Sequence, residues 1–161
     1  MLPPPGEVAE GRPIEGKRKM TQLERVIEQF REYLEGKKVL ELACGTALFS
    51  LAAAKYAESV VCLDLDGSRL DKRVSERDNI VFVTADAAHT GLESASFDWI
   101  VLYNALYHIK DKWPEILAEG KRLLKPAGSF FLISSWKLDK ALMAEMFSGV
   151  EQRDGYSICS V

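Results

Sequence analysis

The segment VLELACGTALFS, residues 39–50, contains the residue types of a turn that a ligand can approach closely. After the apolar residues at its start, the segment has small residues at Ala43, Gly45, Thr46 and Ala47. Where a strand leads into a helix, such residues leave space just where free N–H groups of the helix point outward. A dinucleotide-binding turn would show G-x-G-x-x-G, whereas here only Gly45 is glycine. We therefore expect this turn to hold a ligand other than NAD.

Three acidic residues occur in or just after the first three predicted strands, at Glu41, Asp64 and Asp86. Because the carboxyl ends of neighbouring parallel strands meet at one edge of a sheet, we expect these carboxylates along one rim. A carboxylate in the position of Asp64 can accept two hydrogen bonds from the hydroxyls of a ribose. Three acids on one rim would also attract a cation. The spacing thus indicates a nucleoside site.

Strands and helices must alternate along the chain to bring these residues together. The segments IVFVTAD and FDWIVLYNAL are apolar at nearly every position, which is typical of strands covered by helices on both faces. We therefore predict an α/β fold with a three-layer, doubly wound sheet that is mostly parallel. The expected strands are KVLELA, SVVCLDL, IVFVTAD, FDWIVLYNAL and SFFLISSW, and the expected helices are ALFSLAAAKYA, SRLDKRVSER and residues 112–125, the last ending at KPAG.

The two ends of the chain depart from this alternation. Residues 1–20 hold four of the six prolines and no apolar period, so we expect a flexible arm. Residues 21–35 have the pattern of an amphipathic helix, with Thr21 and Glu24 at capping-box spacing. Near the carboxyl end, a further helix precedes Asp154-Gly155, a pair typical of type I′ turns. A C-terminal antiparallel hairpin should therefore close the sheet.

The order of these motifs resembles the class I S-adenosylmethionine-dependent methyltransferases. The resemblance spans residues 37–135 and rests on VLELACGTA, VVCLDLD, VFVTADA and FDWIVLYNALYHI followed by RLLKPAG. It is strongest to the branch that methylates small molecules, of the ubiquinone-biosynthesis type. The resemblance implies a Rossmann-like methyltransferase fold, S-adenosylmethionine as cofactor and S-adenosylhomocysteine as product.

The resemblance also implies cofactor contacts at the carboxyl ends of the first four strands. The implied residues are Glu41, Ala43 and Gly45 for the methionine part, Asp64 for the ribose hydroxyls, Leu65 for the face of adenine, Asp86 with its neighbour Ala87 for the adenine amino group, and the backbone at Asn104 for the methionine ammonium. One position departs from the family, which usually has a second glycine where this chain has Ala47. The added methyl group could narrow the turn.

Methyl transfer demands little of side chains, because the sulfonium already activates the methyl group and alignment is the main task. A hydroxyl or amine acceptor must still lose a proton, and His108 after the fourth strand is the first candidate for that base. A single histidine beside an apolar strand is more often structural. The same two interpretations apply to four aromatic residues that could line an acceptor pocket, Tyr103, Tyr107, Trp113 and Trp136.

The composition restricts the function classes. The 161 residues, 47% hydrophobic and 28% charged, suit one globular domain, which we place at residues 21–161. The net charge of -3 gives no general attraction to nucleic acids. No apolar run is long enough to span a membrane, and the first residues do not resemble a signal peptide, so we expect a cytoplasmic protein. Three cysteines without C-x-x-C spacing predict buried thiols and no metal site.

The acceptor stays open, although two classes are disfavoured. Enzymes that methylate the amino group of adenine normally have an Asn-Pro-Pro-aromatic turn after the fourth strand, where this chain has Asn-Ala-Leu-Tyr at residues 104–107. Enzymes that methylate a cytosine carbon need a nucleophilic cysteine after the fourth strand, whereas Cys44 and Cys62 both precede that strand. A small-molecule acceptor is therefore expected. Either residues 1–35 cover the site, or it is open to a macromolecular acceptor or partner subunit. The alternative function is a non-catalytic methyltransferase-like scaffold. A nicotinamide-dependent oxidoreductase is disfavoured by the missing glycines.

Overall fold

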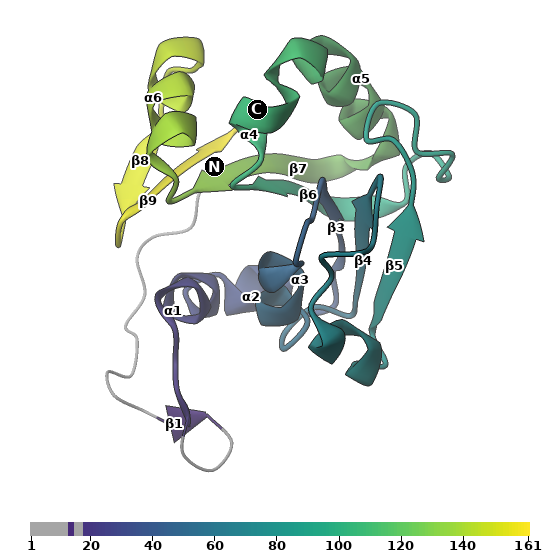
Figure 1. Ribbon diagram of the computed structural model, residues 1–161, viewed down its shortest axis with the longest axis vertical. Coiled ribbons are helices and arrows are strands. Elements are labelled where there is room, and N and C mark those ends of the chain that lie inside the picture. Colours follow the sequence, from purple (N-terminus) through teal and green to yellow (C-terminus); the bar gives the residue numbers. More distant parts are fainter. Residues whose placement is uncertain (1–12, 15–17) are drawn as a thin grey trace.

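A seven-stranded sheet forms the centre of the computed structural model, which describes residues 13–14 and 18–161 (Figure 1). The strand order is β5-β4-β3-β6-β7-β9-β8. The first five of these strands are parallel, and β9 runs antiparallel to both of its neighbours. The strands are β3 (Lys38–Leu42), β4 (Ser59–Asp64), β5 (Ile80–Thr84), β6 (Phe97–Tyr103), β7 (Leu124–Ser134), β8 (Glu151–Arg153) and β9 (Tyr156–Ser160). The predicted parallel sheet with a C-terminal hairpin is confirmed.

The first strand of this sheet, β3, lies in its middle, and later strands are added on both sides of it. The chain moves outward from β3 to β4 and β5, and then crosses back to β6 on the other side of β3. The strand order therefore reverses between β3 and β6. In open α/β sheets a crevice forms at the carboxyl ends of the strands at such a reversal, and this is where ligands bind.

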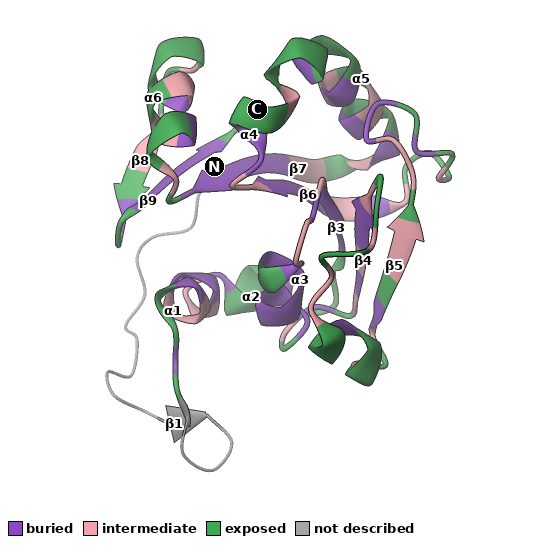
Figure 2. Ribbon diagram, viewed as in Figure 1, coloured by how far each residue is buried: buried purple, intermediate pink, exposed green. Residues whose placement is uncertain are grey.

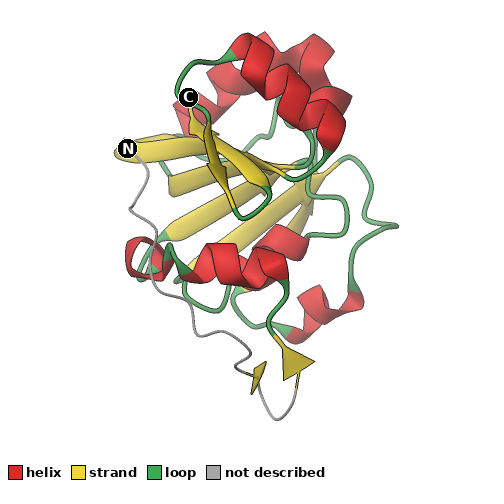
Figure 3. Cartoon of the chain, turned by 90° about the vertical axis from the view of Figure 1, so that its left-hand side faces the viewer, coloured by secondary structure: helices red, strands yellow, loops and turns green. Residues whose placement is uncertain are grey.

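Helices cover both faces of the sheet, which gives the predicted three layers (Figure 3). One face carries α1, α2, α3 and the 3₁₀ helix η2, and the other carries α4, α5 and α6. The helices are α1 (Gln22–Glu28), α2 (Arg31–Leu34), α3 (Leu48–Ala53), η2 (Lys72–Glu76), α4 (Leu106–Ile109), η3 (Lys110–Lys112), α5 (Trp113–Leu123) and α6 (Lys137–Met146). No helix in the described part of the chain is both long and apolar enough to cross a membrane.

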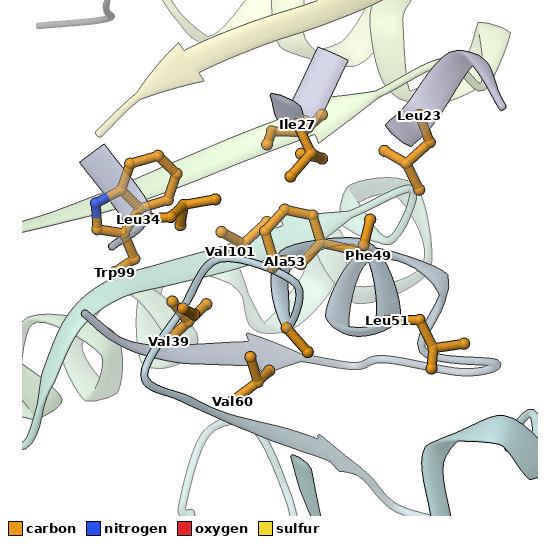
Figure 4. Packing of buried hydrophobic residues seen from close by; sticks show 14 of the residues in the cluster. Leu23, Ile27, Leu34, Val39, Phe49, Leu51, Ala53, Val60, Trp99 and Val101 are labelled. Atoms are coloured by element: carbon orange, nitrogen blue, oxygen red, sulfur yellow. The ribbon is translucent and has the colours of Figure 1, made fainter. Parts of the chain in front are cut away.

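Alternate side chains of the central strands pack on opposite helical layers. In β6, Trp99 and Val101 join the cluster under α1 and α3, whereas Ile100 and Leu102 join the cluster under α5. Figure 4 shows part of the first cluster, with Leu23 and Ile27 from α1 and Phe49 from α3. Buried residues accordingly concentrate in the middle strands and on the helix sides that face them (Figure 2). Two covered faces explain why these strands are apolar at consecutive positions.

The helix expected over residues 21–35 is interrupted. The amides of Gln29 and Phe30 each bond to the carbonyl three residues earlier, at 3.2 and 2.9 Å, so the helix tightens and ends before α2 begins. The break turns the ring of Phe30 into the core, where it meets Trp99 edge-on with centroids 5.8 Å apart. The predicted capping box at Thr21 is confirmed.

Other predicted boundaries also shift. The strand expected as FDWIVLYNAL ends at Tyr103, because Asn104 has φ +51° and cannot continue an extended strand, and the next residues form α4. The helix expected as SRLDKRVSER is reduced to the 3₁₀ turn η2. The KPAG segment lies within β7 rather than before it. Gly128 in this segment lets β7 approach β6 closely, since a Cβ at Gly128 would lie 2.9 Å from the carbonyl oxygen of Asp98.

The C-terminal hairpin is joined to the N-terminal helix. Its turn has positive φ at both Asp154 and Gly155, as a type I′ turn requires, which confirms the prediction. The side chain of Gln22 donates to the carbonyl of Asp154, and that of Gln29 donates to its carboxylate at 3.0 Å. In the predicted arm, β1 (Pro13–Ile14) pairs with β2 (Arg18–Lys19), and residues 1–12 and 15–17 lie outside the described part.

Candidate functional site

A cavity of about 680 Å³ opens at the carboxyl ends of β3, β4 and β6, where the strand order reverses. Eight of the nine residues that the sequence nominates line this cavity. They are Ala43, Gly45, Asp64, Leu65, Asp86, Ala87, Asn104 and His108. Glu41 does not line it. The topology of the sheet thus gathers side chains from four separate segments of the chain into one wall.

The turn after β3 has an unusual backbone. Ala43, Gly45 and Ala47 all have positive φ, at 51°, 55° and 68°. For alanine this conformation costs about 1–2 kcal/mol per residue, so the fold must hold it in place. A hydrogen bond of 2.9 Å from the amide of Cys44 to the carbonyl of Leu63 ties the turn to β4. The methyl group of Ala47, which the sequence suggested could narrow the turn, is fully buried in the core and is absent from the cavity wall.

Asp64 connects the turn to the next strand. One carboxylate oxygen accepts from the amide of Gly45 and the other from the amide of Leu65, each at 2.7 Å. An ionised carboxylate has about four acceptor positions, so each oxygen can still accept a bond from a ligand hydroxyl. Leu65 is 70% exposed on the cavity wall, and such an exposed large apolar side chain offers a flat ligand a surface to cover.

Asp86 marks the other end of the same wall. Its carboxylate accepts from the amide of Ala88 at 2.8 Å and lies 3.6 Å from the ammonium of Lys112. The backbone hydrogen bond, and then the charge of Lys112, lower the pKa of Asp86. The carboxylate therefore stays ionised and fixed beside the start of α5.

Asn104 uses its side chain to organise the sheet edge. Its carbonyl oxygen accepts from the amides of Ser135 and Trp136, at 2.8 and 3.2 Å, and from the hydroxyl of Ser134 at 2.5 Å. These bonds fasten the residue after β6 to the end of β7. Its left-handed backbone, rather than its amide group, is therefore what turns the chain along the cavity.

His108 reaches the cavity from α4. The ring is exposed and stacks on Trp136, with centroids 5.0 Å apart and planes 22° from parallel. The position of α4 depends on Asp139, which is buried in α6 and accepts from the amides of Leu106 and Tyr107 at 3.3 and 2.8 Å. Sequence reasoning missed Asp139, because nothing local links it to amides more than 30 residues earlier.

Glu41 lies beneath the turn instead of beside the cavity. Its Oε1 accepts from the amide and hydroxyl of Ser50, at 3.1 and 2.7 Å, in the first turn of α3. Among the described residues, none forms a hydrogen bond with its Oε2. Burial raises the pKa of Glu41 to about 8. Because the helix N-cap Ala47 has no side-chain acceptor, Glu41 supplies one from the strand, and its predicted contact with a cofactor finds no support in this position.

The aromatic candidates separate into two groups. Trp113 is buried and packs edge-on against Phe130 and Phe147, so its role is structural. Tyr107 is exposed against the edge of Trp136 and lies outside the cavity. Tyr103 does line the cavity. All three cysteines are free and buried, as predicted.

The cavity also contains residues that the sequence did not nominate. The guanidinium of Arg69 lies over the turn, 3.6 Å from the place of a Cβ on Gly45, and Lys112 adds a second cation. Both occupy segments without a recognisable motif, so only the folded chain reveals them. Within residues 13–14 and 18–161, no group of three or more His, Cys, Asp or Glu side chains is arranged to hold a metal ion.

Comparison with known proteins decides the family. Residues 40–132 match the sequence model of a family described as a methyltransferase domain. The chain belongs to this family. The match covers β3 to β7 and therefore includes every strand end that borders the cavity. The resemblance inferred from the motifs, and the Rossmann-like methyltransferase fold that it implied, are both confirmed.

Individual relatives of this methyltransferase domain are distant. A demethylmenaquinone methyltransferase from Staphylococcus epidermidis is 27% identical over 120 residues, 71% of this chain and 49% of the relative. A ubiquinone biosynthesis O-methyltransferase from Actinobacillus pleuropneumoniae is 31% identical over 129 residues, 73% and 53% respectively. The chain thus spans about half the length of these relatives.

A solved structure shows the same fold. It is a Haemonchus contortus phosphoethanolamine N-methyltransferase in complex with phosphomonomethylethanolamine and S-adenosylhomocysteine. Its TM-score with this methyltransferase domain is 0.61 at 23% identity, over 77% of this chain and 32% of that one.

Proposed function

We propose that this methyltransferase domain binds S-adenosylmethionine in the cavity and transfers the methyl group to a small-molecule acceptor, releasing S-adenosylhomocysteine. The observation that carries the proposal is the arrangement of Asp64. Its carboxylate is held by two backbone amides at the end of β4, beside a turn of small residues, and retains free acceptor positions toward the cavity. A ribose diol needs such an acceptor.

The other residues of the cavity suit the remaining parts of this cofactor. Leu65 and Ala87 offer apolar surface for adenine, and Asp86 provides an acceptor for its amino group. Ala43, Gly45 and the backbone at Asn104 would hold the methionine part. The groups that line the cavity therefore fit S-adenosylmethionine, whose sulfonium supplies a methyl group that is already activated.

The protein must then orient the acceptor and accept its proton. Orientation alone contributes much of the rate in such a reaction, because it replaces an encounter of two free molecules by a prearranged one. For a hydroxyl or amine acceptor, His108 is the candidate base on this wall. The small-molecule class is supported by two relatives named for demethylmenaquinone and for ubiquinone biosynthesis.

Calorimetric titration with S-adenosylmethionine, S-adenosylhomocysteine and NADH tests the cofactor. We expect binding of the first two and none of NADH. Asp64→Ala should weaken S-adenosylhomocysteine binding by about 10- to 100-fold, since a hydrogen bond to a charged group contributes about 1.5–3 kcal/mol. Asp66→Ala is the matched control, because this exposed carboxylate bonds only locally to Ser68 and lies outside the cavity.

Two results would count against the proposal. If folded wild-type protein binds neither adenosyl compound, the non-catalytic scaffold becomes the better account. If Asp64→Ala binds as tightly as Asp66→Ala does, Asp64 is not the ribose contact. Circular dichroism of both variants verifies that the fold is retained.

A further inference from the structure

A second cavity, of about 720 Å³, meets the first at two shared residues, Leu48 and Tyr103. It extends along α3, between α1 on one side and η2 on the other. Figure 1 shows these three helices together on one face of the sheet. The two cavities are therefore neighbours that share Leu48 and Tyr103 as a common wall, and no motif in the sequence indicates the second one.

The wall of the second cavity combines apolar, charged and phenolic groups. The apolar residues come from α1 and α3 and are Leu23, Leu48, Leu51 and Ala52. The charged residues are of both signs and are Glu24, Lys55, Arg73, Glu76 and Arg77. Tyr103, which also lines the first cavity, and Tyr156 add two phenol groups. An apolar floor with a few placed polar groups is the usual form of a small-molecule site.

The two phenols belong to Tyr103 and Tyr156, whose hydroxyl oxygens lie 3.5 Å apart. The ring of Tyr103 stacks on Phe49 with centroids 6.3 Å apart, which fixes its direction. Burial and the neighbouring hydroxyl raise the pKa of Tyr103, so it stays protonated. Each phenol has one donor and acceptor capacity, so the pair retains acceptor capacity for a ligand even though Tyr103 also interacts with the side chain of Ser135. Tyr103 lines both cavities and Tyr156 lines the second, so the pair lies where the two cavities meet.

The position of Tyr103 relates the second cavity to the reacting end of the proposed cofactor. Tyr103 lines both cavities and directly precedes Asn104, which with Ala43 would border the methionine part of the cofactor. Asp86, paired with Lys112, would border the adenine end. The methyl group would then face Tyr103 and the second cavity. His108 lines only the first cavity, so an acceptor in the second cavity would lose its proton to solvent, and His108 would be the base only for an acceptor bound on its own side of the first cavity.

We propose that the second cavity is the acceptor site and that it takes an amphipathic molecule. The acceptor's apolar ring or chain lies along α3, and its reacting hydroxyl or amino group is oriented by Tyr103 and Tyr156. This inference rests on the proposed function. The acceptor oxygen or nitrogen would bond to the methyl carbon while the bond between that carbon and sulfur breaks. The electron pair of the broken bond would stay on sulfur, which becomes a neutral thioether, and the acceptor's proton would pass to solvent.

The test uses 2-naphthol as the probe, with the protein first saturated by S-adenosylhomocysteine. In methyl-labelled protein, NMR titration should shift the methyl signals of Leu48, Leu51 and Ala52. The dissociation constant of 2-naphthol should rise at least fivefold in Tyr103→Phe, which keeps the stacked ring and removes the hydroxyl. Tyr107→Phe is the matched control, since the same change is made outside both cavities, and we expect less than a twofold effect.

Each contrary result has a separate meaning. If S-adenosylhomocysteine fails to bind, the proposed function falls and this inference falls with it. If it binds but 2-naphthol shifts signals near His108 and Trp136 instead, or shifts none, the acceptor site is wrongly placed while the proposed function stands. Equal affinity of Tyr103→Phe and wild type for 2-naphthol would remove the role of the phenol pair.

Discussion

At the scale of single residues, Glu41 is the acid whose position least resembles its predicted one. It lies in an apolar layer with one oxygen bonded to Ser50 and the other without a described partner. Burying an ionised carboxylate is costly, and the cost falls when the group takes up a proton. This is why burial raises the pKa of Glu41 to about 8. A neutral Glu41 links β3 to α3 without a buried charge.

The protonation of Glu41 predicts a pH dependence of stability. Between pH 4.5 and about 8 the folded state keeps a proton that the unfolded chain releases. The contribution is complete below pH 4.5 and is lost as the pH rises through 8, with a limiting slope of about 1.4 kcal/mol per pH unit. Glu41→Gln should remove this slope, as urea unfolding across the range will measure.

The control for Glu41→Gln is Glu58→Gln, at an exposed carboxylate 4.0 Å from Lys38. This variant should keep the wild-type pH dependence. If Glu41→Gln showed the wild-type slope as well, Glu41 would be ionised in the folded protein.

At the scale of elements, α4 is held by a side chain from a different helix. Asp139 accepts from two amides of α4, and its carboxylate lies 2.9 Å from the hydroxyl of Ser134, for which Asn104 at 2.5 Å is a second acceptor. Asp139→Ala would leave the two amides without their acceptor, so we expect a loss of about 2–4 kcal/mol in the free energy of unfolding. Asp139→Asn retains one oxygen and should lose less. Urea unfolding of both variants measures this, and a loss below that of Asp139→Asn would contradict the account.

The contact between α5 and β7 is set by a missing side chain. A Cβ on Gly120 would lie 2.2 Å from the ring of Phe130. Gly120→Ala should therefore destabilise the protein by about 1–3 kcal/mol, although alanine favours a helix. In the background of Phe130→Leu the same change should cost less, because the smaller side chain leaves room. Additive effects of the two changes would show that the residues are independent.

The sequence predicts elements best where the pattern is local. The capping box at Thr21 and the turn at Asp154 depend on adjacent residues, and the parallel strands on apolar runs, so all three are confirmed. Element ends depend on tertiary contacts. The tightened turn at Gln29 and Phe30 divides the first helix, and the approach allowed by Gly128 extends β7, neither of which leaves a local signal.

The same distinction holds for the candidate site. The strand-end residues were gathered as predicted because topology alone determines where parallel strands end. Arg69, Asp139 and the second cavity were not, because each depends on how side chains from distant segments pack. The burial of Glu41 against Ser50 belongs to this second group.

At the scale of the whole molecule, the two cavities share Leu48 and Tyr103 but are lined by different layers. The first follows strand ends, whereas the second is lined mainly by residues of α1, α3 and η2. Helix α1 is packed into the core through Val26 and Ile27 and α2 through Leu34, and α1 lines the second cavity. The N-terminal helix thus contributes to both stability and the proposed acceptor site.

Cofactor binding should stabilise this whole unit. A ligand at 100 times its dissociation constant adds about 2.7 kcal/mol to the free energy of unfolding. For a domain of this size we expect saturating S-adenosylhomocysteine to raise the melting temperature by about 5–10 °C. Thermal unfolding monitored by circular dichroism measures the shift. NADH should give none, and an equal shift with NADH would indicate non-specific binding.

A crystal structure of the protein soaked with S-adenosylhomocysteine tests the central claim most directly. The account predicts electron density in the first cavity, with the ribose hydroxyls on the carboxylate of Asp64, adenine against Leu65, and the sulfur facing Tyr103. Density at another place, or a ribose that points away from Asp64, would contradict the assignment of this cavity as the cofactor site.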